Sequence, residues 1–365
     1  MVMTPLTRRL LGSAASTMDR VLVAAFGMGN RRGRAATASL SAQEKLARLA
    51  FVREAYGAPS LFADPDTYFV RPPAVAPKET RVRTLPWGGE CVELSWESVF
   101  EPFHDRVRAK YMSHARNRTA YGRLYVAGST GRPAVILVHG YMAGQWAVEE
   151  RVWPIRWLNG IGLDVALSVL PFHGVRARPE GGAPPFPGTD PRFANEGFRQ
   201  TVADLRVLAA ALRSRGASSV GVMGMSLGGY AAALLGTIER ELACVVPLIP
   251  LASLADAARD QGQLGPDDEP HGIHAALDAA YRVVSPFARP AMVARERVLV
   301  VGAEADRVTP ISHAERIARH FGADLLRLEG GHLLQTWRRP AFRAVREMLR
   351  RNGVLAAVRP AATAG

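Results

Sequence analysis

The stretch of sequence that decides the fold is Ser219-Val-Gly-Val-Met-Gly-Met-Ser226-Leu-Gly-Gly-Tyr230. It begins as an apolar strand, and an Ala/Leu-rich helical pattern follows from Tyr230 to Ile238. The glycines beside Ser226 permit a strand-to-helix turn so tight that larger side chains would clash. Such a turn lifts the Ser226 hydroxyl above the sheet and directs the Leu227 amide, at the helix N-terminus, toward the same point. The pattern also fits a turn that only packs a helix on a strand.

From about residue 130 onward, short apolar runs alternate with helical patterns. This alternation is typical of βαβ units, and runs without period-two alternation favour strands that are covered on both faces of a parallel sheet. The predicted strands are Ala134–Val138, Leu163–Leu170, Ser219–Met225, Ala243–Ile249, Arg297–Val301 and Asp324–Leu328. The predicted helices are 196–215, 227–239, 311–321 and 340–351. Thr309-Pro310 predicts the start of the third helix, with Thr309 as its cap and proline at the first helical position.

The chain before residue 130 predicts a helical start and two more strands. Ser41 and Glu44 form a capping box that opens a helix to about Ala55. Residues 81–98 and 118–127 predict two strands at an antiparallel edge of the sheet.

Two segments interrupt the alternation of strands and helices. Residues 171–195 are rich in proline and glycine and predict a loop. Residues 251–290 are weakly helical, lie between two predicted strands and predict a small helical cap. We therefore expect an N-terminal helical and basic extension (1–80), a main domain (81–350) that carries the cap, and a C-terminal tail (351–365).

Candidate partners for Ser226 follow the last two predicted strands. A serine hydroxyl is a weak nucleophile and needs a base. His332 stands directly after the last strand in Glu-Gly-Gly-His332, and Asp306 follows the strand before it. Glu304 is the alternative acid. The mid-loop position and short side chain of Asp306 favour Asp306 as the group that supports His332.

A strand that ends in His139-Gly140-Tyr141-Met142 predicts an oxyanion hole. The backbone N–H groups of Tyr141 and Leu227 are the expected donors to the negative oxygen of a tetrahedral intermediate. His139 is interpreted as structural, because it holds the turn. His173 repeats the His-Gly pattern at the end of the next strand and is interpreted in the same way.

Residues 130–335 resemble the α/β-hydrolase superfamily. The resemblance rests on HG after one strand, P-x-H-G after the next, G-x-S-x-G-G, D-x-V-x-P and GGH, in that order. It implies an α/β fold with a mainly parallel, doubly wound sheet, flanking helices and a small helical cap. It also implies a serine esterase or lipase that transfers an acyl group to water through a seryl ester. The chain lacks the HGGG motif of one esterase branch, and its first 80 residues match no family.

Three functions remain open at this point. The first is hydrolysis of a small-molecule or lipid ester or thioester. The second is an acyltransferase that passes the same acyl group to an alcohol. The third is a non-catalytic binding protein on the same fold.

The net charge of +13 is concentrated at the two ends of the chain. Arginine supplies 43 of the 46 basic residues, a bias typical of genome composition, and residues 1–36 and 337–365 account for 11 of the 13 net charges. These ends lack an interleaved aromatic platform and any recognisable nucleic-acid motif, so nucleic acid is not an expected partner. Peripheral contact with an anionic membrane remains an alternative.

No cofactor or metal is predicted from the sequence. Cys91 and Cys244 are too few for a disulfide framework or a metal site. In 27–33 the third glycine comes one place too late for a dinucleotide fingerprint, so this segment predicts a turn. Residues 7–11 faintly resemble a twin-arginine signal, but the apolar region behind them is short and broken by Asp19-Arg20. We therefore expect a cytoplasmic protein, with membrane association as the alternative.

Overall fold

The computed structural model describes residues 40–128, 130–265, 268–332 and 338–355. The twin-arginine-like segment, the basic residues 1–36 and the glycine-rich turn at 27–33 lie outside the described residues. Among the described residues, no helix has both the length and the apolar character needed to cross a membrane.

A nine-stranded sheet runs through the centre of the described structure, in the order β1-β2-β3-β5-β4-β6-β7-β8-β9. The six strands from β5 to β9 in this order are parallel. They are β4 (Ala134–Val138), β5 (Asp164–Ser168), β6 (Val220–Met225), β7 (Leu242–Leu248), β8 (Leu299–Ala303) and β9 (Asp324–Leu328). Each of the six apolar runs predicted from the sequence overlaps one of these strands, with ends that differ by at most a few residues. Strands β4, β7 and β8 are buried at every position, as expected for strands with helices on both sides.

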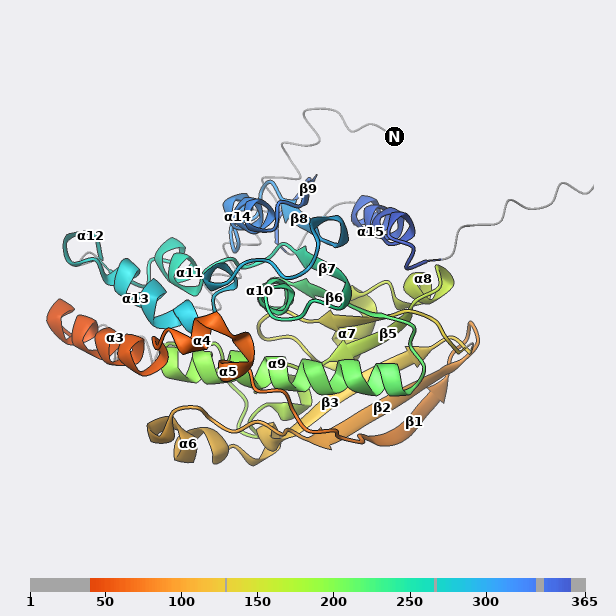
Figure 1. Ribbon diagram of the computed structural model, residues 1–365, viewed down its shortest axis with the longest axis horizontal. Coiled ribbons are helices and arrows are strands. Elements are labelled where there is room, and N and C mark those ends of the chain that lie inside the picture. The colour runs from red at the N-terminus through yellow and green to blue at the C-terminus, as the bar shows by residue number, and fades with distance from the viewer. Residues whose placement is uncertain (1–39, 129, 266–267, 333–337, 356–365) are drawn as a thin grey trace, which may run out of the picture.

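Alternate residues of the parallel strands face two different helical layers. In β4, Ile136 and Val138 belong to the core that includes α9 (Pro191–Ser214) and α10 (Leu227–Gly236). Val135 and Leu137 belong to a second core with α8 (Ile155–Gly160) and α15 (Arg339–Arg351). Figure 1 shows α9 and α10 crossing the near face of the sheet. The sheet is therefore covered on both faces.

The edge of the sheet is antiparallel, as predicted, but it contains three strands. They are β1 (Lys78–Thr84), β2 (Glu90–Glu97) and β3 (Thr119–Val126). The prediction of one strand over 81–98 was wrong, because Gly88 and Gly89 adopt φ of +93° and +88° and close a hairpin between β1 and β2. Strand β1 is exposed along its whole length and is rich in charge, which protects an edge strand from pairing with another chain.

Helices before the sheet pack on the helices of the near face. Helix α3 (Ala42–Tyr56) has the predicted capping box and is followed by α4 (Ser60–Ala63) and α5 (Pro65–Tyr68). The Tyr56 hydroxyl donates a hydrogen bond to Glu196 of α9 at 2.8 Å. Helix α3 also contacts α13 (Ile273–Tyr281). Residues 40–77 thus pack against the main body, and the predicted domain boundaries near 80 and 350 remain predictions.

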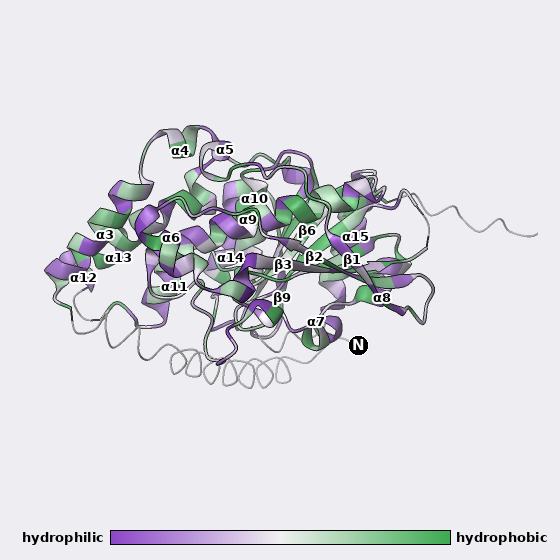
Figure 2. Cartoon of the chain, turned by 90° about the horizontal axis from the view of Figure 1, so that it is seen from below, coloured by the Kyte–Doolittle hydropathy of each residue, from purple (hydrophilic) through white to green (hydrophobic). Residues whose placement is uncertain are grey.

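The predicted loop and insertion flank the carboxyl ends of the strands. Residues 171–195 form a loop only to Asp190, which caps α9 ahead of Pro191. The insertion (residues 251–290) contains α11 (Leu254–Asp260), α12 (Asp268–His271) and α13, and these lie beside α3 at one end of the molecule (Figure 1). In Figure 2 the central strands and α10 are mainly hydrophobic, whereas α12 at the rim is hydrophilic.

The remaining helices are short. They are α6 (Asp105–Met112), α7 (Trp146–Val152) and α14 (Ile311–Phe321), together with 3-10 turns at 115–118, 174–176, 282–284, 286–288 and 295–297.

Candidate active site

Ser226 occupies a strained turn between β6 and α10. Its backbone adopts φ 56° and ψ −112°, a region that costs an ordinary L-residue free energy and is retained where the surroundings enforce it. A Cβ atom on Gly224 would overlap the Gly228 carbonyl, and one on Gly228 would overlap the Val138 carbonyl. The two glycines are therefore needed for the turn, as the sequence predicted.

Backbone hydrogen bonds hold this turn from both sides. The Ser226 N–H donates to Leu248 at the end of β7, at 3.0 Å. The Ser226 carbonyl accepts from Tyr230 at 3.0 Å and from Leu251 at 3.2 Å. The serine backbone is thus fixed by its own helix and by the segment that follows β7.

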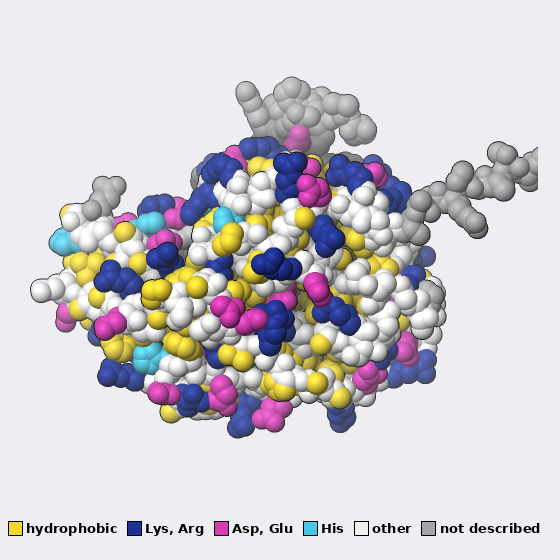
Figure 3. Space-filling model, viewed as in Figure 1, with side chains coloured by type: hydrophobic (Ala, Val, Ile, Leu, Met, Phe, Trp, Pro, Cys, Tyr) yellow, Lys and Arg dark blue, Asp and Glu magenta, His cyan; other side chains and the backbone are white. Residues whose placement is uncertain are grey.

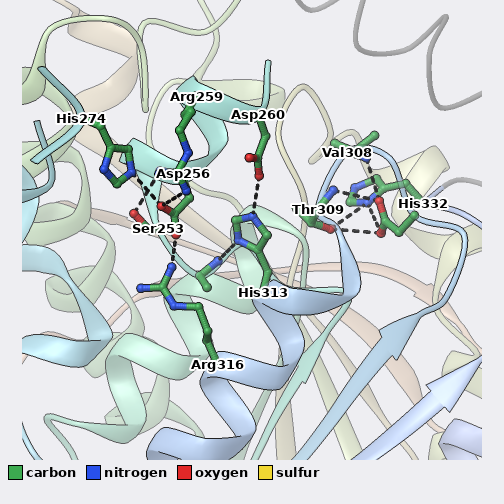
Figure 4. Close-up of polar contacts among 12 residues, drawn as sticks. Ser253, Asp256, Arg259, Asp260, His274, Val308, Thr309, His313, Arg316 and His332 are labelled. Atoms are coloured by element: carbon green, nitrogen blue, oxygen red, sulfur yellow. Dashed lines mark hydrogen bonds and ion pairs between the residues drawn. The ribbon is translucent and has the colours of Figure 1, made fainter. Parts of the chain in front are cut away.

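Asp306 and His332 form a buried hydrogen-bonded pair. Figure 4 shows His332 at the right, beside Val308 and Thr309. Asp306 Oδ2 accepts from His332 Nδ1 at 2.8 Å, and Asp306 Oδ1 accepts from the N–H groups of Val308 and Thr309, each at 2.8 Å. An ionised carboxylate only accepts hydrogen bonds, so the proton of the imidazole is on Nδ1. Nε2 is then the ring nitrogen with the lone pair.

Glu304, the alternative acid, lies elsewhere. Its carboxylate accepts from Arg327 at 3.0 Å, and the Glu304 side chain is 49% exposed, whereas that of Asp306 is fully buried. The structure therefore pairs His332 with Asp306, which sequence reasoning had favoured.

Thr309 is a member of this cluster that sequence reasoning missed. It was expected to cap α14, but that helix begins at Ile311 with Pro310 as its cap residue. The Thr309 hydroxyl instead lies 3.0 Å from the Ile249 carbonyl, 3.0 Å from Asp306 Oδ2 and 3.1 Å from His332 Nδ1. A hydroxyl has one proton, so it donates to one of the two acceptor oxygens at a time. Thr309 thereby links the acid–histidine pair to the segment after β7.

The end of β7 connects the two parts of the candidate site. The Leu248 carbonyl accepts from Ser226, and the carbonyl of the next residue, Ile249, accepts from Thr309. Ile249 itself has a positive φ of 39°. The serine turn and the acid loop thus share a support at the carboxyl edge of the parallel strands, where ligands bind in open α/β sheets.

The turn after β4 faces Ser226. A Cβ atom on Gly140 would lie 3.5 Å from Ser226 Cβ and 4.0 Å from Ser226 Oγ. Tyr141 follows directly, and Leu227 is the first residue of α10, where an amide has no acceptor within its own helix. Of the two residues predicted to donate to an oxyanion, Leu227 therefore follows Ser226 in the chain, and Tyr141 follows Gly140, which lies beside Ser226.

His139 is tied into the fold through both ring nitrogens. Nδ1 donates to the Gly140 carbonyl at 2.7 Å, and Nε2 accepts from the Leu170 amide at 3.0 Å. Burial lowers its pKa. These contacts agree with a structural role in the turn.

His173, in the second His-Gly turn, is fully buried. Nδ1 donates to the Pro171 carbonyl at 2.8 Å, and the ring lies 5.2 Å from that of His139. Burial, reinforced by the neighbouring His139, lowers the pKa of His173 to about 3. The ring is therefore neutral near neutral pH and acts as a packing element.

Within residues 40–128, 130–265, 268–332 and 338–355, no group of three or more His, Cys, Asp or Glu is arranged to hold a metal ion. Cys91 and Cys244 are buried thiols, and burial raises the pKa of both.

The similarity of this chain to known proteins is distant. No protein-family model matches the chain. It is 29% identical over 317 residues to uncharacterized proteins of two Mycobacterium tuberculosis strains, CDC 1551 / Oshkosh and ATCC 25618 / H37Rv, with 84% of this chain and 75% of each relative covered.

Two similar solved structures are acetyl xylan esterases. For acetyl xylan esterase 1 from Thermoanaerobacterium sp. JW/SL YS485, the TM-score is 0.50 at 17% identity, covering 78% of this chain and 91% of that one. For the enzyme from Paenibacillus sp. R4, the TM-score is 0.55 at 14% identity, covering 78% and 92%. The mixed sheet, its flanking helices and this likeness fit a fold of the α/β-hydrolase type.

Proposed function

We propose that the protein is a serine hydrolase that cleaves a carboxylic ester or thioester through a seryl acyl-enzyme. The observation that carries the proposal is the 2.8 Å hydrogen bond from His332 Nδ1 to a fully buried Asp306. It fixes the tautomer in which Nε2 takes up a proton, as a general base for a serine requires. Ser226, in its strained turn at the same edge of the sheet, is the proposed nucleophile.

The proposed reaction has two halves. In the first, Ser226 Oγ attacks the carbonyl carbon while its proton moves to His332 Nε2. The tetrahedral intermediate collapses, the leaving alcohol or thiol takes that proton, and the acyl group stays on Ser226. In the second half, His332 Nε2 accepts a proton from water while the water oxygen attacks the carbonyl carbon of the seryl ester. The second tetrahedral intermediate collapses, the bond to Ser226 Oγ breaks, Oγ takes the proton back from His332, and the carboxylic acid is released. Asp306 stabilises the imidazolium in both halves.

The negative oxygen of each tetrahedral intermediate is assigned to the backbone N–H groups of Leu227 and Tyr141. The closeness of Gly140 to Ser226 and the position of Leu227 at the start of α10 support this assignment. Losing one such donor typically costs about 3 kcal/mol of transition-state stabilisation. The insertion after β7 is proposed as a cap over the site.

An esterase also agrees with the acetyl xylan esterases of similar fold. The acyltransferase alternative uses the same acyl-enzyme and differs only in the acceptor. Adding a primary alcohol to the assay distinguishes the two, because a transferase diverts most of the acyl group to the alcohol at low alcohol concentration.

A fluorophosphonate probe tests the nucleophile directly. Wild-type protein is expected to be labelled, to hydrolyse p-nitrophenyl esters and to show a preferred chain length, and Ser226→Ala is expected to lose labelling and turnover. Labelling of another serine, or inert wild-type protein, would refute the proposal.

We further propose a cytoplasmic protein that contacts anionic membranes through its basic ends. On the face seen in Figure 3, basic and acidic side chains are interspersed, whereas 11 of the 13 net charges belong to residues 1–36 and 337–365. Basic residues near an anionic bilayer gain about 1 kcal/mol each.

Vesicle binding tests this proposal. Replacing the six arginines of residues 1–36 by Gln is expected to weaken binding to phosphatidylserine vesicles at low salt and to leave turnover of a water-soluble ester unchanged. Equal vesicle binding by both proteins would leave arginine bias as the explanation of the charge.

A further inference from the structure

His313, on the first turn of α14, lies between the segment that supports Ser226 and the insertion. Its side chain is 3% exposed. Nδ1 accepts from the Ala252 amide at 2.9 Å, and Nε2 faces Asp260 Oδ2 at 3.2 Å. A backbone N–H only donates and a carboxylate only accepts, so the ring carries its proton on Nε2 and both nitrogens have partners. Figure 4 shows His313 facing Asp260, with Thr309 and His332 to their right.

The amide that His313 holds belongs to the support of the nucleophile turn. Ala252 is fully buried, and a buried N–H requires an acceptor inside the protein. The N–H of the preceding residue, Leu251, donates to the Ser226 carbonyl. The segment 249–252 is thus fixed at one end by Thr309 and at the other by His313, with the contact to Ser226 between them.

The other nitrogen of His313 faces the insertion. Asp260 is the last residue of α11, and the hydrogen bond from His313 lowers the pKa of its carboxyl group. Helix α11 meets α14 at a second point, where Asp256 pairs with Arg316. His274 of α13 also bonds Asp256, at 2.7 Å. The insertion and the nucleophile support therefore share α14 as a common base.

We propose that His313 is a positioning residue for Ser226. Its Nδ1 fixes the 249–252 segment that holds the backbone of the nucleophile, and its Nε2 ties that segment to α11 of the insertion. The proposal rests on the proposed role of Ser226 as nucleophile. His313 touches no reacting atom and acts through Ala252 and Leu251.

Two substitutions separate the functions of the two ring nitrogens. In His313→Asn, the side-chain oxygen stands at the same bond distance from the backbone as Nδ1 and preserves an acceptor for Ala252. In His313→Gln, the terminal amide reaches the position of Nε2 and preserves a donor for Asp260, but the acceptor for Ala252 is lost. The two side chains are both neutral amides, so each is the matched control of the other.

The first readout is independent of activity. Hydrogen exchange of the Leu251 and Ala252 amides is expected to become about tenfold faster in His313→Gln, the effect of losing one buried hydrogen bond, and to stay near the wild-type rate in His313→Asn.

The second readout is kinetic. With p-nitrophenyl acetate, kcat and the rate of fluorophosphonate labelling are expected to fall about tenfold in His313→Gln, with KM changed little, because the nucleophile and not substrate binding is disturbed. His313→Asn is expected to restore most of kcat.

The two proposals fail in different ways. Inactive wild-type protein would refute the serine hydrolase, whereas the exchange readout still tests the contact to Ala252. An active wild type with wild-type kcat and exchange in His313→Gln would overturn the positioning role. Equal impairment of both variants, or failure of both to fold, would also overturn it, because an acceptor for Ala252 would then be insufficient.

Discussion

Among the described residues, two histidine–aspartate pairs are linked to the segment that follows β7, His332–Asp306 through Thr309 and His313–Asp260 through Ala252, and they differ in the ring nitrogen that faces the carboxylate. In the pair His332–Asp306, Nδ1 is the donor, and the carboxylate is fully buried. In the pair His313–Asp260, Nε2 faces the carboxylate, which is 34% exposed, and Nδ1 accepts from a backbone amide.

The difference shows that a histidine beside an aspartate is not by itself a base. A base needs a ring nitrogen that can exchange a proton with the reacting group while the other nitrogen holds the tautomer. His332 has its tautomer fixed through Nδ1, so Nε2 is the nitrogen for that exchange. In His313 the backbone occupies the nitrogen that would have to accept the proton. The first pair suits catalysis, and the second suits positioning.

The largest effect is expected from removing the charge of the first pair. Asp306→Asn keeps the size of the side chain but favours the wrong imidazole tautomer, so ester turnover should fall by about 10⁴-fold. Glu304→Gln, the matched change at an exposed carboxylate two residues away, should leave kcat near the wild-type value. Steady-state kinetics of both variants decide the assignment, and an inactive Glu304→Gln with an active Asp306→Asn would reverse it.

Among the residues that the structure describes, His173 has no carboxylate beside it, and its burial should make the folded protein less stable as the pH falls. A histidine whose imidazolium is stabilised by a carboxylate would have the opposite effect on stability. Burial lowers the pKa of His173 to about 3, whereas an unfolded histidine titrates near 6.5. Between these values the unfolded chain binds the extra proton, so stability falls as the pH decreases from 6.5 to 3, by up to roughly 5 kcal/mol in total.

Thermal unfolding between pH 7 and pH 4 measures this effect. His173→Asn preserves a donor for the Pro171 carbonyl and removes the titrating group, so its unfolding midpoint should depend less on pH. The exposed His271→Asn serves as a control that should keep the wild-type pH dependence. Identical slopes for all three proteins would show that His173 does not contribute.

Substitutions of Thr309 test whether both histidine–aspartate pairs depend on the segment that follows β7. Thr309→Val leaves the buried Ile249 carbonyl without its hydroxyl partner, which costs about 1–3 kcal/mol of stability. It should also lower kcat, since Asp306 loses a neighbour that orients it. Thr309→Ser, which keeps the hydroxyl, should restore both quantities in chemical unfolding and kinetic assays. A Thr309→Val variant with the stability and kcat of the wild type would show that Thr309 does not support the site.

Local signals made much of the architecture predictable. Apolar runs separated by helical patterns predicted the six parallel strands, and the glycines around Ser226 predicted the turn, because both depend on neighbouring residues. The pairing of His332 with Asp306 was also predicted, from the order of strands along the chain. The catalytic roles of these residues remain predictions.

Long-range contacts explain what the sequence did not reveal. The Ile249 carbonyl that Thr309 contacts is 60 residues away in the chain, and the Ala252 amide that His313 holds is 61 residues away. Thr309 also carried a misleading local signal, since a threonine before proline is a common helix cap. The hairpin between β1 and β2 was missed for another reason. Gly88 and Gly89 had marked the turn locally, but the whole of 81–98 was interpreted as one strand.

The smallest effect on kcat is expected from the aspartate-to-asparagine substitution in the pair His313–Asp260. Asp260→Asn keeps a hydrogen-bond acceptor for His313 Nε2 and leaves the bond from Ala252 to Nδ1 in place. The carboxylate is partly exposed, where such pairs contribute about 0–1 kcal/mol, so kcat should change by less than about threefold.

The pKa of Asp260 sets the expected pH dependence of this small effect. Its pKa is lowered in the folded state by the bond from His313. The stability that it contributes is therefore present above the unfolded pKa and is lost as the pH falls through the folded pKa. The stabilities of wild type and Asp260→Asn should differ most near neutral pH and converge in strong acid.

Measured side by side, Asp306→Asn and Asp260→Asn should differ by at least about a thousandfold in kcat. Similar losses in the two variants would mean that both histidine–aspartate pairs serve the chemistry.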